Sequence, residues 1–278
     1  MSATLSYVSV VNKGHPPPER WCLVLHGILG TKSNLRTVAR RVVETKPAWG
    51  LLLVDLRNHG ESRAGFAPPH TLDASARDLT ALRDALGLRV DAVVGHSYGG
   101  KVALAYGAQV AGALDALVVI DATPSARTDA RGAEETVRIV ALLGELGPGP
   151  FATREAFMEQ VIADGHSRDI AAWLAMNLER DGGAWKLGVD PAAIRAMLDD
   201  HLSRDLWPVV ESPPGRMTLE LVIGARSRAF DDADRTRALA AQAAHPDRVH
   251  VHVVEAAGHW VHVDAPDFVV ELLTRVLR

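Results

Sequence analysis

Short runs of continuously apolar residues recur along the chain, and they restrict the possible folds more than any other feature. Clear examples are "GLLLVDL" at 50–56, "VDAVVGH" at 90–96, "ALVVIDA" at 116–122 and "LELVIGA" at 219–225. Strands that are apolar at every position are typical of parallel sheets covered on both faces. Segments with helical periodicity separate these runs. We therefore expect an α/β fold with a doubly wound, mostly parallel sheet.

The alternation of strands and helices is interrupted once. Residues 125–207 contain several helical patterns and no convincing strand. We predict that residues 125–207 form a helical cap, and that residues 1–124 and 208–278 form the core. Within the core, the helical pattern that begins near residue 72 has Thr71 or Asp73 as its expected cap, and Gly87 as its expected end.

The composition excludes several classes of protein. The chain has 278 residues and one cysteine, so an intramolecular disulfide is impossible, and we expect Cys22 to be a buried core residue. The net charge is −4 and no dense Lys/Arg tract is present, which argues against nucleic-acid binding. The first residues do not resemble a signal peptide, and no apolar stretch approaches the roughly 20 residues of a membrane span. We expect a cytoplasmic monomer or homodimer.

One serine lies between two glycines, directly after an apolar run. Gly95-His96-Ser97-Tyr98-Gly99 fits the pattern G-x-S-x-G, with a predicted strand before it and a predicted helix after it. In that setting the serine occupies a strained turn that exposes its hydroxyl. The N-terminus of the following helix favours developing negative charge. We predict that Ser97 is a catalytic nucleophile.

A phosphate-binding loop is the competing interpretation of the same residues. Gly95 to Lys101 satisfies most of the pattern G-x-x-x-x-G-K-[ST]. The next residue is Val102, which has no hydroxyl for magnesium. The segment also lies in the middle of the strand series, whereas such a loop usually opens it. The nucleophile interpretation is favoured.

A serine nucleophile needs a general base, and His259 is the best candidate. It lies in a glycine-containing loop after the last predicted strand, and the order serine then histidine suits a hydrolase of this architecture. His262 is interpreted as structural. His250 and His252 alternate along a strand and could suggest a metal site, but no third ligand is in an evident position. We therefore predict no metal site.

The acid that orients the base has two candidate positions. Asp121 ends the strand that follows the nucleophile's helix, so it should lie beside Ser97. An aspartate at the end of an apolar strand is costly to bury without a partner, and an imidazole would supply one. Asp231 and Asp232 lie in a later loop, in a run of charged residues. We favour Asp121 and keep the later pair as the alternative.

Two backbone N–H groups are expected to form an oxyanion hole. One belongs to Tyr98, the residue after the nucleophile, and the other to Ile28 in "LHGILG". His26 is expected to orient that loop. Aromatic and thioether side chains near the site are the predicted substrate contacts: Trp260, Trp173 and Met176.

With these residues identified, the chain resembles the α/β-hydrolase superfamily over nearly its whole length. The motifs that carry the resemblance are "LHGILGTKSN", "VDLRNHGES", "GHSYGGKVAL" and "GHWVHVDAP". Within the superfamily they are similar to the small abhydrolase-type serine esterases. Ser227 and Arg228 depart from the pattern, because much of the superfamily has its acid there. Some branches place the acid after the preceding core strand, where Asp121 stands.

The resemblance implies a serine triad, a helical cap, no cofactor and hydrolysis of small to medium acyl esters or thioesters. It also implies that Asp55, Arg57 and His59 in "VDLRNHGES" are architectural. Perhydrolase, lyase and carbon–carbon hydrolase activities use the same triad and stay open. A ligand-binding, receptor-like protein with slow turnover is the alternative from a different class.

Overall fold

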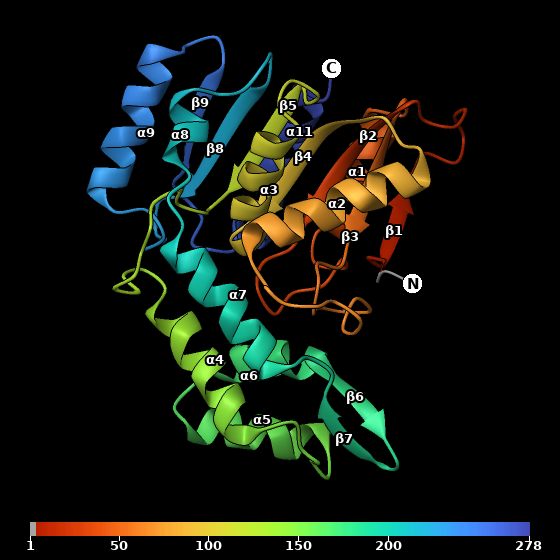
Figure 1. The fold of residues 1–278 in the computed structure, drawn as a ribbon, viewed down its shortest axis with the longest axis vertical. Coiled ribbons are helices and arrows are strands. Elements are labelled where there is room, and N and C mark those ends of the chain that lie inside the picture. Colours follow the sequence, from red (N-terminus) through yellow and green to blue (C-terminus); the bar gives the residue numbers. More distant parts are fainter. Residues whose placement is uncertain (1–3) are drawn as a thin grey trace.

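A mixed sheet of seven strands lies between the helices of the core (Figure 1). The computed structural model describes residues 4–278, so residues 1–3 of the predicted core lie outside the described part. The strand order is β1-β3-β2-β4-β5-β8-β9, and only β1 is antiparallel to its neighbour. The predicted α/β class with a mostly parallel sheet is confirmed. The strands are β1 (Tyr7–Val10), β2 (Arg20–Leu25), β3 (Trp49–Val54), β4 (Val90–His96), β5 (Ala116–Ile120), β8 (Thr218–Gly224) and β9 (Val249–Val254).

Helices cover both faces of the sheet, which explains why its strands are apolar at every position. In β4, Val93 packs into the core layer beneath α2 and α3, whereas Val94 packs into the layer beneath α1 and α11. Cys22 is buried in the second of these layers, as predicted. The core helices are α1 (Arg36–Thr45), α2 (Leu72–Leu86), α3 (Tyr98–Gln109), α8 (Trp207–Glu211), α9 (Asp232–Ala244), α10 (Val261–Asp264) and α11 (Pro266–Val276).

Both predicted boundaries of α2 are confirmed. The Thr71 side chain caps the helix by accepting a hydrogen bond from the backbone N–H of Ala74 at 3.1 Å, and Asp73 lies in the first turn. Gly87 ends the helix in the left-handed conformation, with φ of 61°. That conformation is the usual reason for glycine at this position.

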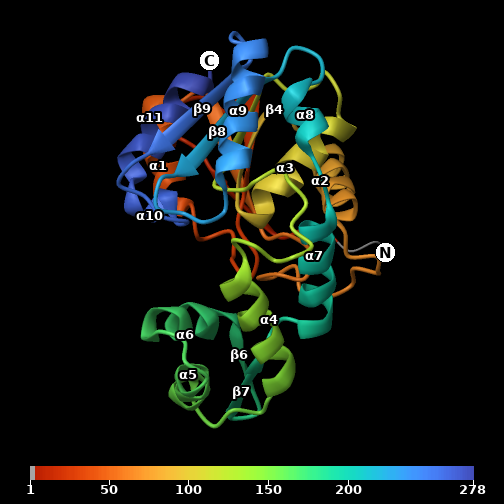
Figure 2. The same cartoon turned by 90° about the vertical axis from the view of Figure 1, so that its left-hand side faces the viewer.

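The segment 125–207, which we call the cap, lies beyond one end of the sheet (Figures 1 and 2). It contains an antiparallel hairpin, so the prediction that it has no strand is wrong. The hairpin strands are four residues each and largely half-exposed, which leaves a weak apolar pattern in the sequence. The cap elements are α4 (Glu134–Leu146), α5 (Arg154–Ala163), α6 (Arg168–Leu174), the 3₁₀ turn η1 (Ala175–Asn177), β6 (Leu178–Asp181), β7 (Ala184–Leu187) and α7 (Pro191–Ser203).

A buried lysine fastens both ends of the cap to the core. The ammonium of Lys101, on α3, donates to the carbonyls of Ser125 at 2.7 Å, His201 at 2.8 Å and Arg204 at 2.8 Å. Ser125 lies where the chain enters the cap, and the other two carbonyls lie where it leaves. All three N–H groups are therefore used, and two acceptors lie at the C-terminal end of α7, where a cation is favourable. The Lys101 ammonium does not serve a phosphate-binding loop.

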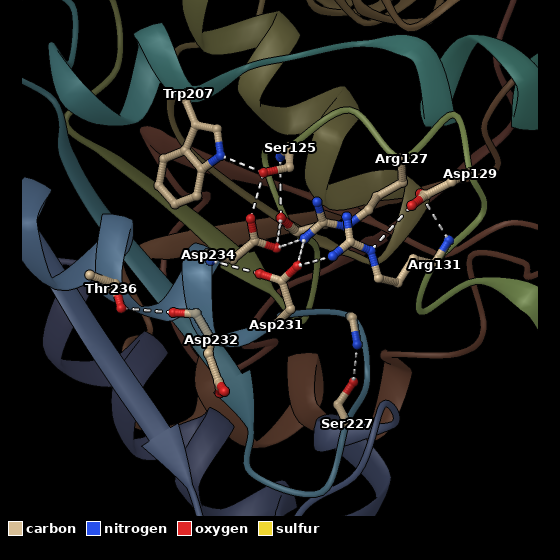
Figure 3. A network of polar contacts seen from close by, with 12 residues as sticks. Ser125, Arg127, Asp129, Arg131, Trp207, Ser227, Asp231, Asp232, Asp234 and Thr236 are labelled. Carbon is tan, nitrogen blue, oxygen red and sulfur yellow. Dashed lines mark hydrogen bonds and ion pairs between the residues drawn. The ribbon is translucent and has the colours of Figure 1, made fainter.

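A second buried network lies at the same junction (Figure 3). Asp234 on α9 accepts hydrogen bonds from Ser125 Oγ at 2.5 Å and Thr123 Oγ1 at 2.6 Å, and it pairs with Arg127. The indole N–H of Trp207 donates to Ser125 Oγ at 2.7 Å. Because every polar group here has a partner, the entry and exit of the cap are held together against α3 and α9.

We predict that Lys101→Met lowers stability and loosens the cap. The substitution keeps the apolar stem but leaves three buried carbonyls without their donor, at a cost of roughly 1–3 kcal/mol or more. Thermal unfolding should shift downward, and limited proteolysis should cut faster near residues 124–130. Lys186→Met is the matched control, because Lys186 makes exposed ion pairs in the hairpin and should change stability by less than about 0.5 kcal/mol. An unchanged melting temperature for Lys101→Met would contradict this role.

Candidate active site

Ser97 lies at the turn between β4 and α3, in a strained backbone conformation with φ of 53° and ψ of −120°. The flanking glycines are sterically required. A Cβ atom at Gly95 would lie 2.0 Å from the carbonyl oxygen of Gly99, and one at Gly99 would lie 2.5 Å from that of His26. No other side chain fits at either position without moving the backbone. The strand–turn–helix arrangement predicted for this motif is therefore present.

A cavity of about 570 Å³ opens at this turn, between the core and the cap. Its volume is within the range of small-molecule sites. Its lining combines apolar side chains of the cap with charged residues of the cap and of the loop after β8. The predicted site residues that line it are Ile28, Ser97, Tyr98, Asp121, Trp173, His259 and Trp260.

His259 and Asp121 form a hydrogen-bonded pair in the wall of this cavity. The imidazole Nδ1 donates to the Asp121 carboxylate at 2.7 Å, across 138 residues of sequence. The carboxylate also accepts from the backbone N–H of Gly224 at 2.9 Å and from Ser227 Oγ at 2.5 Å. The Asp121 side chain is 0% exposed, so these donors replace the water that a buried charge would lose. Its own φ is 47°, a left-handed value that aspartate tolerates better than most residues.

Ser227 is a site residue that the sequence analysis did not assign. It occupies the position at which the sequence departs from the superfamily pattern, and it supplies a hydroxyl to Asp121. Its Oγ also accepts from the backbone N–H of Ala229 at 3.1 Å, which fixes the direction of the hydroxyl. The sequence did contain a signal for this role: a serine stands where much of the superfamily has its acid. A carboxylate at the end of the neighbouring strand, here Asp121, needs a hydrogen-bond donor at that position.

Asp231 has partners other than His259, and Figure 3 shows them. Asp231 caps α9 through the backbone N–H of Asp234 at 2.8 Å and forms ion pairs with Arg127 at 3.1 Å and Arg131 at 3.2 Å. Asp232 lies in the first turn of that helix, where a negative charge is favourable. Of the three candidate carboxylates, Asp121 is the one that forms a hydrogen bond with His259 in the described part of the chain.

Two further histidines lie against His259 and are buried. His96 donates from Nε2 to the carbonyl oxygen of His259 at 2.8 Å, and the His262 ring packs against His96 with centroids 4.6 Å apart. Burial lowers the pKa of His262 to about 4 and holds the pKa of His96 well below its usual range. Both rings are therefore neutral at pH 7 and place no positive charge next to His259. The structural interpretation of His262 is supported.

His250 and His252 share a different partner. Both rings contact the buried carboxylate of Glu220 on the neighbouring strand β8, at 2.9 Å and 2.6 Å. Among residues 4–278, no group of three or more His, Cys, Asp or Glu side chains is placed to hold a metal ion.

None of the helices in the same part of the chain is long and apolar enough to cross a membrane.

The loop after β2 brings a backbone N–H to the cavity opposite Tyr98. Gly30 N–H bonds the carbonyl of Gly27 at 3.0 Å, which closes a turn with Ile28 and Leu29 at its centre. Within residues 4–278, the backbone N–H groups of Ile28 and Tyr98 donate to no protein acceptor. Both residues line the cavity beside Ser97. Their role as oxyanion donors stays a prediction.

The imidazoles of His26 and His59 orient this loop through hydrogen bonds. His26 donates from Nδ1 to the carbonyl of Gly27 at 2.7 Å and accepts from the backbone N–H of Leu56 at 3.0 Å, as expected for a structural residue. His59 donates to the carbonyl of Arg57 and accepts from the backbone N–H of Leu29, both at 2.9 Å. Burial, together with the nearby His26, lowers the pKa of His59 to about 3, so its ring stays neutral and keeps an acceptor.

The other residues of "VDLRNHGES" are also structural. Asp55 is buried and pairs with the Lys32 ammonium at 2.6 Å. The Arg57 guanidinium binds the Asp78 carboxylate at 2.6 Å and 3.0 Å. These contacts support the architectural interpretation of this motif.

Of the three predicted substrate contacts, two line the cavity. Trp173 of the cap and Trp260 of the core pack edge to face, with ring centroids 5.4 Å apart, and together they close one wall. Met176 is not part of the lining, and 48% of it is exposed on the cap surface. The prediction for Met176 is wrong because the helical pattern ends at η1, which turns this side chain outward.

The chain is similar to known hydrolases and esterases. The model of the alpha/beta hydrolase family matches residues 22–272. The mouse protein sn-1-specific diacylglycerol lipase ABHD11 is 31% identical over 91% of this chain and 79% of its own length. Esterase YbfF of Escherichia coli is 27% identical over 92% of each chain. Among solved structures, a marine microorganism esterase superposes with a TM-score of 0.82 at 22% identity, over 99% of this chain and 100% of its own.

The two candidate acids can be separated by mutation. We predict that Asp121→Asn lowers kcat for ester hydrolysis by at least roughly 10²-fold, because an amide cannot hold and charge-stabilise the imidazole as a carboxylate does. The double change Asp231→Asn with Asp232→Asn should cost less than about tenfold, since 26% of the Asp231 side chain is exposed and asparagine can still cap α9. The measurement is steady-state kinetics on variants of equal thermal stability. The reverse ranking would move the acid to the later loop.

Proposed function

The chain belongs to the alpha/beta hydrolase family and hydrolyses esters, and we propose that it does so through a Ser97–His259–Asp121 triad and an acyl-enzyme. The observation that carries the proposal is the buried carboxylate–imidazole pair of Asp121 and His259, which lines the same cavity as the strained turn of Ser97. A carboxylate behind an imidazole, and a hydroxyl in front of it, is the arrangement that activates a serine.

Each step of the reaction has a residue to perform it. The imidazole of His259 takes the hydroxyl proton of Ser97 while Oγ attacks the carbonyl carbon of the ester. The same imidazole, now protonated, returns the proton to the leaving alcohol as the carbon–oxygen bond breaks. Water then attacks the acyl-enzyme with His259 again as base, which releases the carboxylic acid and restores Ser97. Asp121 stabilises the imidazolium in both halves.

The backbone N–H groups of Ile28 and Tyr98 would hold the oxyanion of the tetrahedral intermediate. Tyr98 begins α3, so its N–H lies at the positive end of a helix. Such preorganised donors act on charge that develops only in the transition state, and removing one typically lowers kcat by about 10²–10³-fold. The same residues could also hydrolyse a thioester, because the nucleophile attacks the acyl carbonyl in both kinds of substrate.

The apolar part of the cavity wall is suited to an acyl chain. Trp173 and Trp260 close one side, and Ile139, Ile170, Leu198 and Leu202 of the cap add further apolar surface. Burial of a methylene group is worth about 0.8 kcal/mol. A cavity of about 570 Å³ can hold a small to medium acyl group, and each methylene group buried there strengthens binding. We propose that the cap, through these side chains, sets the acyl preference.

The nucleophile is tested by Ser97→Ala. We predict that this variant loses p-nitrophenyl ester hydrolysis and labelling by a fluorophosphonate probe, while its circular dichroism is unchanged. Ser33→Ala, which removes an exposed hydroxyl in the loop before α1, is the control and should retain both. Labelling or burst kinetics that persist in Ser97→Ala would rule out the assignment.

The role of the cap is tested by Trp173→Ala. We predict that the ratio of kcat/KM for an eight-carbon ester to that for a four-carbon ester changes by at least about fourfold, the value of one methylene contact. Trp185→Ala is the control, because Trp185 lies on the cap hairpin and does not line the cavity. If both variants fold and both keep the wild-type chain-length preference, the cap does not determine it.

A further inference from the structure

The turn that carries Ile28 depends on a strained neighbour. Leu29 has a φ of 59°, a left-handed conformation that disfavours a branched side chain and is usually taken by glycine or asparagine at this place in a turn. Such a residue persists only where its surroundings fix it. Its N–H is held by the neutral ring of His59 at 2.9 Å. The question is what holds its carbonyl.

The carbonyl of Leu29 is held by the cap. The side-chain amide of Asn177 donates from Nδ2 to Leu29 O at 3.0 Å, across 148 residues of sequence. Asn177 is buried in η1, between α6 and β6. Nδ2 also approaches the carbonyl of Leu174 at 3.4 Å, and the backbone carbonyl of Asn177 accepts from Gly188 N–H at 2.8 Å. Both contacts fix the amide within the cap.

We propose that Asn177 is a positioning residue that couples the docked cap to the oxyanion hole. By holding the Leu29 carbonyl, it keeps the turn 27–30 in the conformation that presents the Ile28 N–H to the cavity. The inference rests on the proposed esterase function. It assigns to the cap a part in transition-state stabilisation, in addition to its part in lining the acyl site.

The hydrogen bonds on Leu29 act on opposite sides of one strained residue. His59 belongs to the core and is present whether or not the cap is docked, whereas Asn177 reaches Leu29 only from the cap. Without Asn177 the buried carbonyl of Leu29 has no hydrogen-bond donor. A rotation of the turn 27–30 would then be favoured, because it could bring this carbonyl to another donor. A displacement of about 1 Å at a catalytic donor is enough to lower a rate by 10²-fold.

Asn177→Leu tests the proposal, because leucine has a similar volume and donates no hydrogen bond. We expect kcat for p-nitrophenyl esters to fall by roughly tenfold or more, less than for loss of a direct oxyanion donor. KM should change by less than about threefold, since the ground-state ester depends little on that donor. The affinity for an alkyl boronic acid, which forms a tetrahedral adduct on the serine, should fall by a similar factor as kcat/KM. A residue that only packs the cap would not lower the two together.

Glu179→Gln is the matched control. Glu179 lies two residues after Asn177 and links the cap to the core through an ion pair with Arg63, without touching the turn. We expect its kcat and boronic acid affinity to stay within about twofold of wild type. A second test variant, Asn177→Asp, keeps the shape of the side chain and lacks the amide donor when ionised. It should show the same loss of kcat and of boronic acid affinity even if Asn177→Leu fails to fold.

Two results would overturn the proposal. One is wild-type kcat and boronic acid affinity in a folded Asn177 variant. The other is an equal loss in Glu179→Gln, which would mean that any loosening of the cap has this effect. Failure of the proposed function is a different result: wild-type protein would then neither hydrolyse the esters nor react with the fluorophosphonate probe.

Discussion

The burial of the Asp121 carboxylate is the constraint around which the site is arranged. A fully buried charge must be satisfied by hydrogen bonds, and Asp121 obtains them from the backbone of Gly224, the hydroxyl of Ser227 and the imidazole of His259. These donors come from β8, from the loop that follows it and from the loop after β9. The carboxylate therefore links the end of β5 to the end of β8 and to the loops after β8 and β9, beside the turn that carries Ser97. A residue with this many obligatory partners also fixes the tautomer of the imidazole.

Buried charges also attach the cap, but they are satisfied differently. The Lys101 ammonium is bound by three carbonyls from the entry and exit of the cap, and the Asp234 carboxylate by two hydroxyls and the Arg127 guanidinium. Breaking either set would leave buried polar groups without partners, which is more costly than losing a surface ion pair. The junction is therefore held firmly on the side of α3 and α9. Other contacts between cap and core include those of Asn177, the Trp173–Trp260 pair and the Arg63–Glu179 ion pair.

The histidines of the site illustrate how burial assigns a role to one residue type. His59, His96 and His262 are buried, and desolvation lowers the pKa of each of them. A neutral imidazole can donate through one nitrogen and accept through the other, which is how His59 holds both Arg57 O and Leu29 N–H. Only His259 combines a carboxylate partner with a place in the cavity wall.

The sequence by itself determined the fold class, the turn around Ser97 and the candidates His259 and Asp121. Those features are set by local periodicity, by glycines that a Cβ would exclude, and by the rule that parallel strands bring their carboxyl ends to one edge of the sheet. Only the tertiary structure shows the contact of Asp121 with His259, the hydrogen bond from Ser227, the cap hairpin and the exposed position of Met176. The hairpin is half-exposed and leaves little pattern, and Asn177 reaches Leu29 across 148 residues. Contacts of that range depend on how the cap packs on the core, and no local stretch of sequence carries that information.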